Sequence, residues 1–260
     1  MMLLVGGVLA GCSMEYRLAN DFVAQSERAK VAVYFPQQIE FTNCRDTEHG
    51  AELVALKDVS NERFLQIMHN SYLKTLEEYK LELYIPEDDN EIQVDSLHWL
   101  VSLSNMEVQE MVSLQEDAWI VGEERLTYDL FLNTVNTASW FELNNKEWSP
   151  LLYVERELKD DFDSKIDFSY FYDQVNYSYY IDTIQPDDVY SYAVFLGKLY
   201  AGYTYDYFLN EFVRAKMLEK DRHPSAYYRY DPYMKHLKRS VNGDRFVVIH
   251  NEEEVVEDNE

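Results

Sequence analysis

The chain has 260 residues, and 47% of them are hydrophobic, which is enough to bury a core and argues against a disordered protein. Its formal net charge of −25 argues against nucleic-acid binding, because phosphate contacts require basic side chains. The same charge disfavours peripheral binding of the whole protein to anionic lipid.

The chain starts with MMLLVGGVLAG, a stretch without any charge. An apolar run of about ten residues cannot span a bilayer, which takes roughly twenty, but it has the length of a signal-peptide core. The following Leu9-Ala10-Gly11-Cys12 resembles a bacterial lipobox, in which small residues admit the peptidase and the thiol receives a diacylglyceryl group. The resemblance implies cleavage before Cys12 and lipidation of Cys12 with acyl chains such as palmitate, although the usual basic residues before the run are absent. The alternative is a buried apolar strand that ends in Cys12.

The lipobox resemblance and the composition divide the chain into four expected segments. We expect a lipoprotein signal peptide at 1–11, a lipidated tether with a short docking element at 12–28, and a single α+β domain at 29–250. Residues 251–260 are expected to be a disordered acidic tail, because six of the nine residues of EEEVVEDNE (252–260) are acidic.

The first half of the domain predicts a strand, a helix and a second strand. KVAVYFP places a strand at 29–36, which 39–42 continues after a bend. Ser60 is a good N-cap for an amphipathic helix at 60–79, whose apolar residues recur at helical spacing. A strand at 81–86 follows, so the three elements predict a split βαβ unit.

The middle of the chain predicts mainly strands. They are expected at 92–103, 107–114, 118–122, 127–143, 151–158 and 166–181. The long 127–143 segment and 151–158 are expected to form a hairpin. Residues 166–181, IDFSYFYDQVNYSYYI, are rich in tyrosine, which is typical of sheet surfaces and interfaces.

The strongest helical signal begins at Pro186, a favourable first-turn residue, and runs to about residue 219. Gly197 lies four residues from Ala193 and Ala201, which predicts close packing of this helix on a sheet; Gly202 is a possible break. A final strand is expected at 245–250. The fold class is therefore α+β, a mostly antiparallel sheet with one or two long amphipathic helices packed on it.

Sequence motifs of catalysis are missing. The chain has no phosphate-binding glycine loop, no G-x-S-x-G and no H-E-x-x-H, and its six histidines lack zinc-ligand spacing. His69 is expected on the helix surface. The carboxylates Asp160, Asp161, Asp163 and Asp167 lack a calcium-loop pattern and are expected to be a solvated turn. No catalytic residue, metal site or cofactor is predicted.

The order of CSMEYRLANDFV, KVAVYFP, a long Trp-bearing strand and LGKLYAGYTYDYFLN resembles uncharacterised outer-membrane lipoproteins of the Bacteroidota. At a coarser level it is similar to periplasmic lipoprotein domains of the curli-secretion and penicillin-binding-protein-activator type, which bind other envelope proteins. The resemblance implies an outer-membrane anchor. Residues 13–17 lack an acidic run, which favours the periplasmic face over the cell surface.

Two functions are open at this point. The first is a non-catalytic accessory subunit of an outer-membrane protein complex for secretion or barrel assembly. The second is a lipid-anchored carbohydrate-binding module or glycan-acting enzyme. For the first, the expected interface is one face of the 166–181 segment, with Tyr170, Tyr172, Tyr177 and Tyr179.

Overall fold

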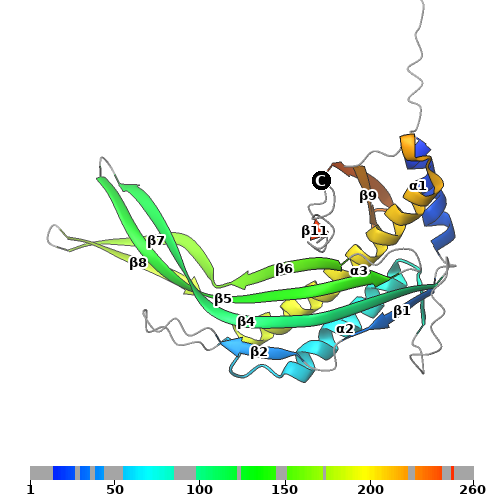
Figure 1. The fold of residues 1–260 in the computed structure, drawn as a ribbon. Coiled ribbons are helices and arrows are strands. Elements are labelled where there is room, and N and C mark those ends of the chain that lie inside the picture. Colours follow the sequence, from blue (N-terminus) through cyan, green and yellow to red (C-terminus); the bar gives the residue numbers. More distant parts are fainter. Residues whose placement is uncertain are drawn as a thin grey trace, which may run out of the picture.

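The protein folds as α+β, as the sequence predicts, with helices packed against a main sheet, and two long hairpins project from this body (Figure 1). The computed structural model describes residues 14–26, 30–35, 39–43, 55–84, 98–121, 124–144, 151–171, 174–221, 226–241 and 247–248. Cys12 and the acidic tail lie outside these ranges. The helices are α1 (Met14–Gln25), α2 (Asn61–Glu78) and α3 (Pro186–Lys216), and a short 3-10 helix spans Glu219–Asp221.

The main sheet is mixed, which corrects the expectation of a mostly antiparallel one. Its strands are β1 (Lys30–Tyr34), β2 (Glu40–Asn43), β3 (Glu82–Tyr84), β4 (His98–Val121), β5 (Glu124–Asn144), β6 (Leu151–Lys159) and β11 (Val247–Val248). The order is β11-β6-β5-β4-β1-β3, and β2 pairs with β4 farther along. The pairs β1–β3, β1–β4 and β2–β4 are parallel, and the others are antiparallel.

The strand–helix–strand unit at the start of the domain is confirmed, but it is not split. β1 and β3 are direct neighbours, with no strand between them. Helix α2 connects them and begins where the sequence predicts, because the Ser60 hydroxyl accepts the backbone N–H of Arg63 at 3.3 Å. Its buried stripe is Phe64, Met68, Tyr72 and Leu76.

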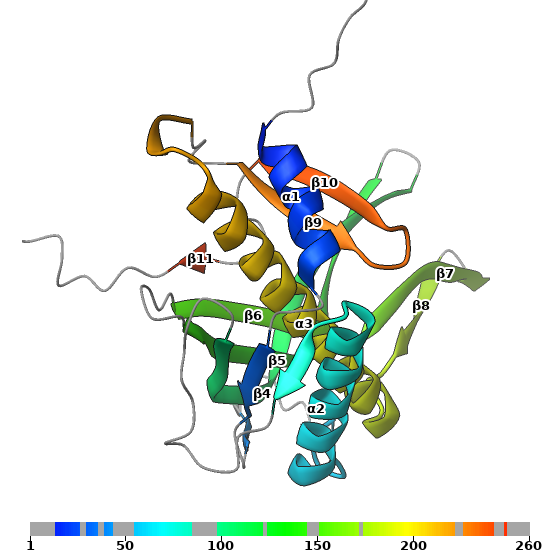
Figure 2. The same cartoon turned by 90° about the vertical axis from the view of Figure 1, so that its right-hand side faces the viewer.

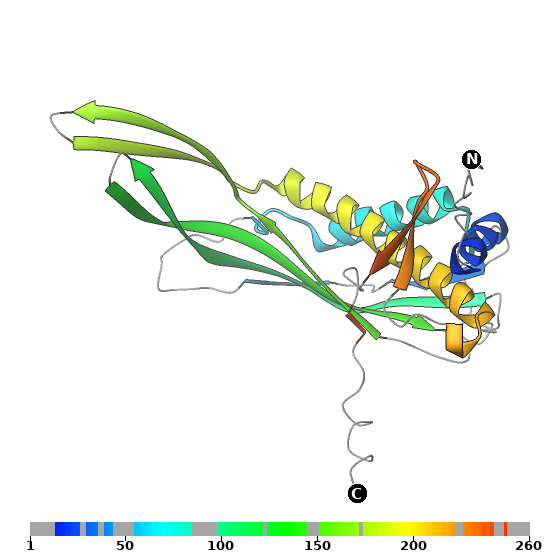
Figure 3. The ribbon, with the colours of Figure 1, turned by 90° about the horizontal axis from the view of Figure 1, so that it is seen from above.

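The central helix α3 is longer and more buried than an amphipathic surface helix. It starts at Pro186, where the Asp188 carboxylate accepts the backbone N–H of Gln185 at 2.8 Å, and it continues through Gly202 without a break. Gly197 packs against the backbone of α2, not against the sheet as expected. Buried residues occur all around α3, so it packs on the sheet and is itself covered by other elements. Figure 3 shows it running along the body.

Helix α1 adds to the core from a segment that was expected to be a tether. Ala19 and Phe22 are buried, and the ring of Phe22 lies 5.3 Å from Phe212 and 5.7 Å from Tyr205 of α3. The folded domain therefore includes residues from Met14 onward, and the docking element is a helix.

Strands β4 and β5 form one long hairpin, where the sequence predicted several shorter strands. The described parts of these expected segments, 98–103, 107–114 and 118–121, belong to a single strand that is interrupted only by an irregularity between Ser104 and Glu107, while 92–97 and 122 lie outside the described residues. The partner strand β5 reaches from Glu124 to Asn144 and pairs with β6, as predicted for the 151–158 segment. Both long strands extend beyond the body of the molecule (Figure 1).

Two further hairpins complete the fold. The expected strand at 166–181 is instead part of a hairpin of β7 (Asp161–Phe171) and β8 (Gln174–Asp182). The hairpin of β9 (Ala226–Asp231) and β10 (His236–Val241) has no counterpart among the predicted strands. It lies beside α1 at the end of the body (Figure 2) and is bound to α3 by Asn210, whose amide group accepts the N–H of Tyr228 and donates to its carbonyl.

Candidate protein-interaction surface

The two projecting hairpins point in the same general direction, away from α1 (Figures 1 and 3). β6 pairs with β5 only as far as Thr134, and β2 pairs with β4 only as far as Glu110. Beyond these points, among the residues that the structure describes, β4 and β5 pair only with each other. The hairpin of β7 and β8, which we call the β7–β8 arm, is a separate two-stranded sheet that pairs with no other strand in the described part of the chain.

The register of the β7–β8 arm divides its positions between two faces, one of which has more aromatic residues than the other. Phe168 lies opposite Tyr177, and Tyr170 lies opposite Val175. Because directly opposed positions and positions two apart share a face, these four belong together with Tyr179. The other face contains the positions of Asp167, Ser169, Gln174, Asn176 and Ser178, together with those of the aromatic residues Phe171 and Tyr180. The sequence prediction that Tyr170, Tyr177 and Tyr179 share a face therefore agrees with the backbone register, while Tyr172 lies outside the described residues.

Asp160 fixes the root of the β7–β8 arm. One carboxylate oxygen accepts the backbone N–H of Asn133 on β5 at 2.7 Å, and the other accepts that of Ile184, just before α3, at 2.8 Å. The backbone N–H of Asp160 donates to the carbonyl of Asn133 at 2.9 Å. The side chain is only 5% exposed, which corrects the expectation that this aspartate lies in a solvated turn. Asp160 thus holds both ends of the arm against the body.

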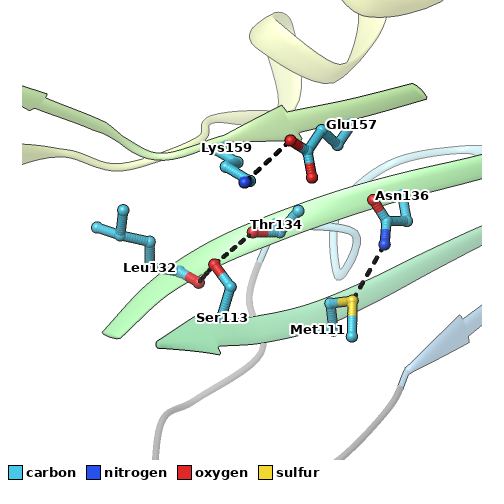
Figure 4. Close-up of polar contacts among 7 residues, drawn as sticks. All are labelled: Met111, Ser113, Leu132, Thr134, Asn136, Glu157 and Lys159. Carbon is cyan, nitrogen blue, oxygen red and sulfur yellow. Dashed lines mark hydrogen bonds and ion pairs between the residues drawn. The ribbon is translucent and has the colours of Figure 1, made fainter. Parts of the chain in front are cut away.

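A set of polar contacts stabilises the root of the longer hairpin (Figure 4). The Ser113 hydroxyl lies 3.0 Å from that of Thr134 and donates to the Leu132 carbonyl at 3.3 Å. The Asn136 amide donates to the sulfur of Met111 at 3.1 Å. These contacts join β4 to β5 where β6 ends. The exposed ion pair of Lys159 and Glu157, also drawn there, adds little because water screens it.

The β4–β5 hairpin also exposes apolar side chains just beyond this root. Leu114 and Phe131 lie directly opposite each other and are 48% and 40% exposed. Their neighbours Leu130 and Leu132, on the other face of the ladder, are buried. The β4–β5 hairpin therefore exposes one directly opposed apolar pair beyond its root.

Many of the tyrosines serve the core, contrary to the expectation that they belong to interfaces. The hydroxyl of Tyr192 lies 3.0 Å from that of Thr137, and the hydroxyl of Tyr200 lies 2.6 Å from that of Ser139. These contacts bind α3 to β5. Burial raises the pKa of Tyr200 to about 12 and also raises the pKa of Tyr192, so both hydroxyls stay neutral. They are structural groups and poor candidates for acid–base chemistry.

The buried carboxylate of Glu110 is likewise occupied by backbone groups. Glu110 accepts the N–H of Ala55 at 2.8 Å and that of Leu56 at 2.9 Å, which holds the segment before α2 against β4. His69 is half-buried, with its ring 4.5 Å from that of Phe35, and burial lowers its pKa; the expected surface position is thus wrong. No group of three or more His, Cys, Asp or Glu suited to a metal occurs among the residues that the structure describes.

Comparison with known proteins assigns this chain to no family. No protein-family model matches the chain, and no curated protein matches it. Within the described ranges, none of the helices combines the length and apolar character needed to cross a membrane.

Proposed function

We propose that this protein is a lipid-anchored envelope protein that acts without catalysis as an accessory subunit of an outer-membrane complex, which it contacts through the β7–β8 arm. The observation that carries this proposal is the register of the arm, which gathers Phe168, Tyr170, Val175, Tyr177 and Tyr179 on one face. The face lies on a hairpin that belongs to no larger sheet in the described residues.

The low stability expected of an isolated two-stranded hairpin supports a binding role for the β7–β8 arm. A two-stranded hairpin is at best marginally stable in water by itself, and an aromatic face that another protein covers adds burial. Asp160 holds the root of the arm through buried hydrogen bonds, so part of the ordering cost is met before a partner binds. The arm is therefore suited to present a preformed surface.

The arrangement of the molecule also fits the proposed anchor. Cys12 would carry the lipid two residues before α1, and α1 lies at the end of the body opposite the tips of the two hairpins (Figures 1 and 3). A protein tethered in this way would direct its hairpins away from the anchor, into the space where membrane-bound complexes present their soluble domains. Residues 13–17 favour the periplasmic face.

The carbohydrate hypothesis has less support. A glycosidase needs two carboxylates that face a cleft. The buried carboxylates Glu110 and Asp160 instead each accept two backbone N–H groups, which gives both a structural role. An aromatic face could still stack on a sugar, and the experiment below separates this possibility from a protein partner.

The test is co-purification from native membranes in mild detergent, followed by mass spectrometry. Tyr177→Ser removes one ring from the aromatic face, and Tyr180→Ser is the matched control, because it removes the same side chain from a position on the other face of β8. We expect the wild type and Tyr180→Ser to retain an outer-membrane protein in stoichiometric amount. We expect Tyr177→Ser to lose most of it.

Three results would contradict the proposal. Equal recovery by the two variants would remove the arm from the interface. A monomeric wild type in every extract would remove the accessory-subunit function, and binding to a glycan array by such a monomer would establish the carbohydrate alternative. Cys12→Ser should move the protein from the membrane fraction to the soluble fraction; if it stays with the membranes, the lipid at Cys12 is not the anchor.

A further inference from the structure

One sequence segment of this acidic protein is basic. Residues 214–241 contain eight Lys and Arg against three Asp and Glu, a net charge of +5, so the rest of the chain carries −30. This segment comprises the last residues of α3, the connection that follows and the β9–β10 hairpin. The net charge of the whole chain hides this local excess.

The ladder of the hairpin places two cations directly across from each other. Arg229 lies opposite Lys238, and Asp231 lies opposite His236 on the same face. Side chains in directly opposed positions of a ladder are close neighbours, so both cations can contact one bound anion. The two cations line an open hollow of about 380 Å³, together with Tyr230, Asp231, Met234 and His236.

Asp231, the acidic residue that lines this hollow, stabilises the turn of the hairpin. The carboxylate of Asp231 accepts the backbone N–H of Tyr233 at 2.9 Å and that of Met234 at 3.1 Å. The side chains of Tyr233 and Met234 are 77% and 76% exposed, and the hydroxyl of Tyr233 donates to the carboxylate of Glu78, the last residue of α2, at 3.0 Å. The tip therefore presents an aromatic ring and an apolar chain to the surroundings, beside one acidic residue. Such side chains are favoured where protein meets the headgroup region of a membrane.

The hairpin lies next to the place where the proposed anchor would join the domain. The guanidinium of Arg239 is 3.5 Å from the carboxylate of Glu15, and the hydroxyl of Tyr228 donates to the same carboxylate at 3.3 Å. Glu15 is the second residue of α1 and comes three residues after Cys12. Figure 2 shows α1, β9 and β10 together on this end of the body.

We propose that the β9–β10 hairpin binds the phosphate of anionic phospholipid headgroups, with Arg229 and Lys238 as the phosphate ligands and Tyr233 and Met234 at headgroup level. The choice of a lipid over a soluble phosphate rests on the anchor of the proposed function. The acidic hairpins lie at the other end of the molecule (Figure 1), and charges farther away than about 8 Å are largely screened at physiological ionic strength. The cations of the hollow are therefore weighed against the nearby acids Asp231, Glu15 and Glu78, and not against the net charge of the whole chain.

The experiment measures vesicle flotation of the full chain carrying Cys12→Ser, so that no lipid anchor contributes. Vesicles of phosphatidylcholine alone are compared with an equal mixture of phosphatidylcholine and phosphatidylglycerol. Arg229→Gln with Lys238→Gln is compared with a control of the same net charge, Lys57→Gln with Lys198→Gln, at two exposed positions away from the hairpin. Melting curves by circular dichroism establish that all variants are folded.

A basic side chain at an anionic surface contributes about fivefold to partitioning, so we expect the hairpin double variant to bind mixed vesicles about 25-fold more weakly than the control. Lys235→Gln, at the exposed turn, should weaken binding about fivefold. Binding to phosphatidylcholine alone should be the same for all of them.

Equal binding of the double variant and its control to the mixed vesicles would overturn the proposal, as would a parent protein that binds both kinds of vesicle equally. If inorganic phosphate raises the melting temperature of the control but not of the hairpin variant, and phosphatidylglycerol has no effect, the hollow takes a soluble anion and the lipid assignment is wrong. None of these results depends on whether the β7–β8 arm binds a partner, which co-purification tests separately.

Discussion

Substitution of Gly197 by alanine tests how closely α2 and α3 approach each other. A Cβ atom at this position would lie 2.3 Å from the carbonyl oxygen of Met68, 2.8 Å from Cβ of Ser71 and 2.9 Å from the backbone nitrogen of Tyr72. Two of these three atoms belong to the backbone of α2 and cannot rotate away. The methyl group therefore forces the two helices apart.

Three contributions determine the expected loss of stability. Overpacking of a well-packed interface costs about 1–3 kcal/mol, and contact with backbone atoms places Gly197→Ala at the upper end. Separation of the helices also weakens two hydrogen bonds between them, from Ser71 to the Val194 carbonyl and between the hydroxyls of Tyr72 and Thr204, at about 1 kcal/mol each. Alanine returns about 1 kcal/mol through its better helix propensity. We expect a net loss of about 3–4 kcal/mol in the free energy of unfolding.

The assay is urea unfolding followed by circular dichroism, with Lys198→Ala as the matched control. Lys198 is the next residue on α3 and is exposed, so its substitution should change the free energy of unfolding by less than about 0.5 kcal/mol. If Gly197→Ala is as stable as Lys198→Ala, the helices do not approach closely at this point, and the reasoning is refuted.

Two further predictions concern the root of the β7–β8 arm and the buried tyrosines. Asp160→Ala leaves two backbone N–H groups without their acceptor, so it should lower the free energy of unfolding in urea by about 2–4 kcal/mol and make proteolysis of the arm faster. The control Asp161→Ala, at the exposed neighbouring position, should be close to neutral. Equal unfolding midpoints for the two variants would contradict the anchoring role of Asp160. The pKa of Tyr200 is raised to about 12, above its value in the unfolded chain, so its contribution to stability is complete below about pH 10 and is lost as the pH rises through about 12. Alkaline unfolding monitored by tyrosinate absorbance should therefore be less steep in Tyr200→Phe, and an unchanged slope would show that this hydroxyl is not buried in the native state.

For the β7–β8 arm, the local sequence pattern predicted which tyrosines share a face but did not predict the turn between the two strands. Alternation along 174–179 is enough to place Tyr177 and Tyr179 on one face, because side chains of a strand point to opposite faces in turn. The turn that divides 166–181 into two strands was missed, because it lacks the glycine that marks most short hairpins. The basic hollow of the β9–β10 hairpin was missed for a different reason. It depends on which residues face each other across a ladder, and the net charge of −25 pointed in the opposite direction.

The sequence by itself determined the elements whose signals are local. Helix α2 begins after Ser60 because a hydroxyl cap acts within one turn, and α3 begins at Pro186 because proline fits the first turn of a helix. Only the tertiary structure decided which partner each surface meets. Gly197 faces α2 and not the sheet, β4 is one continuous strand because β5 pairs with it along its length, and Asp160 is buried because backbone groups far away in the chain, at Ile184 and Asn133, converge on it. These contacts join residues distant in sequence, so local propensity and periodicity contain no information about them.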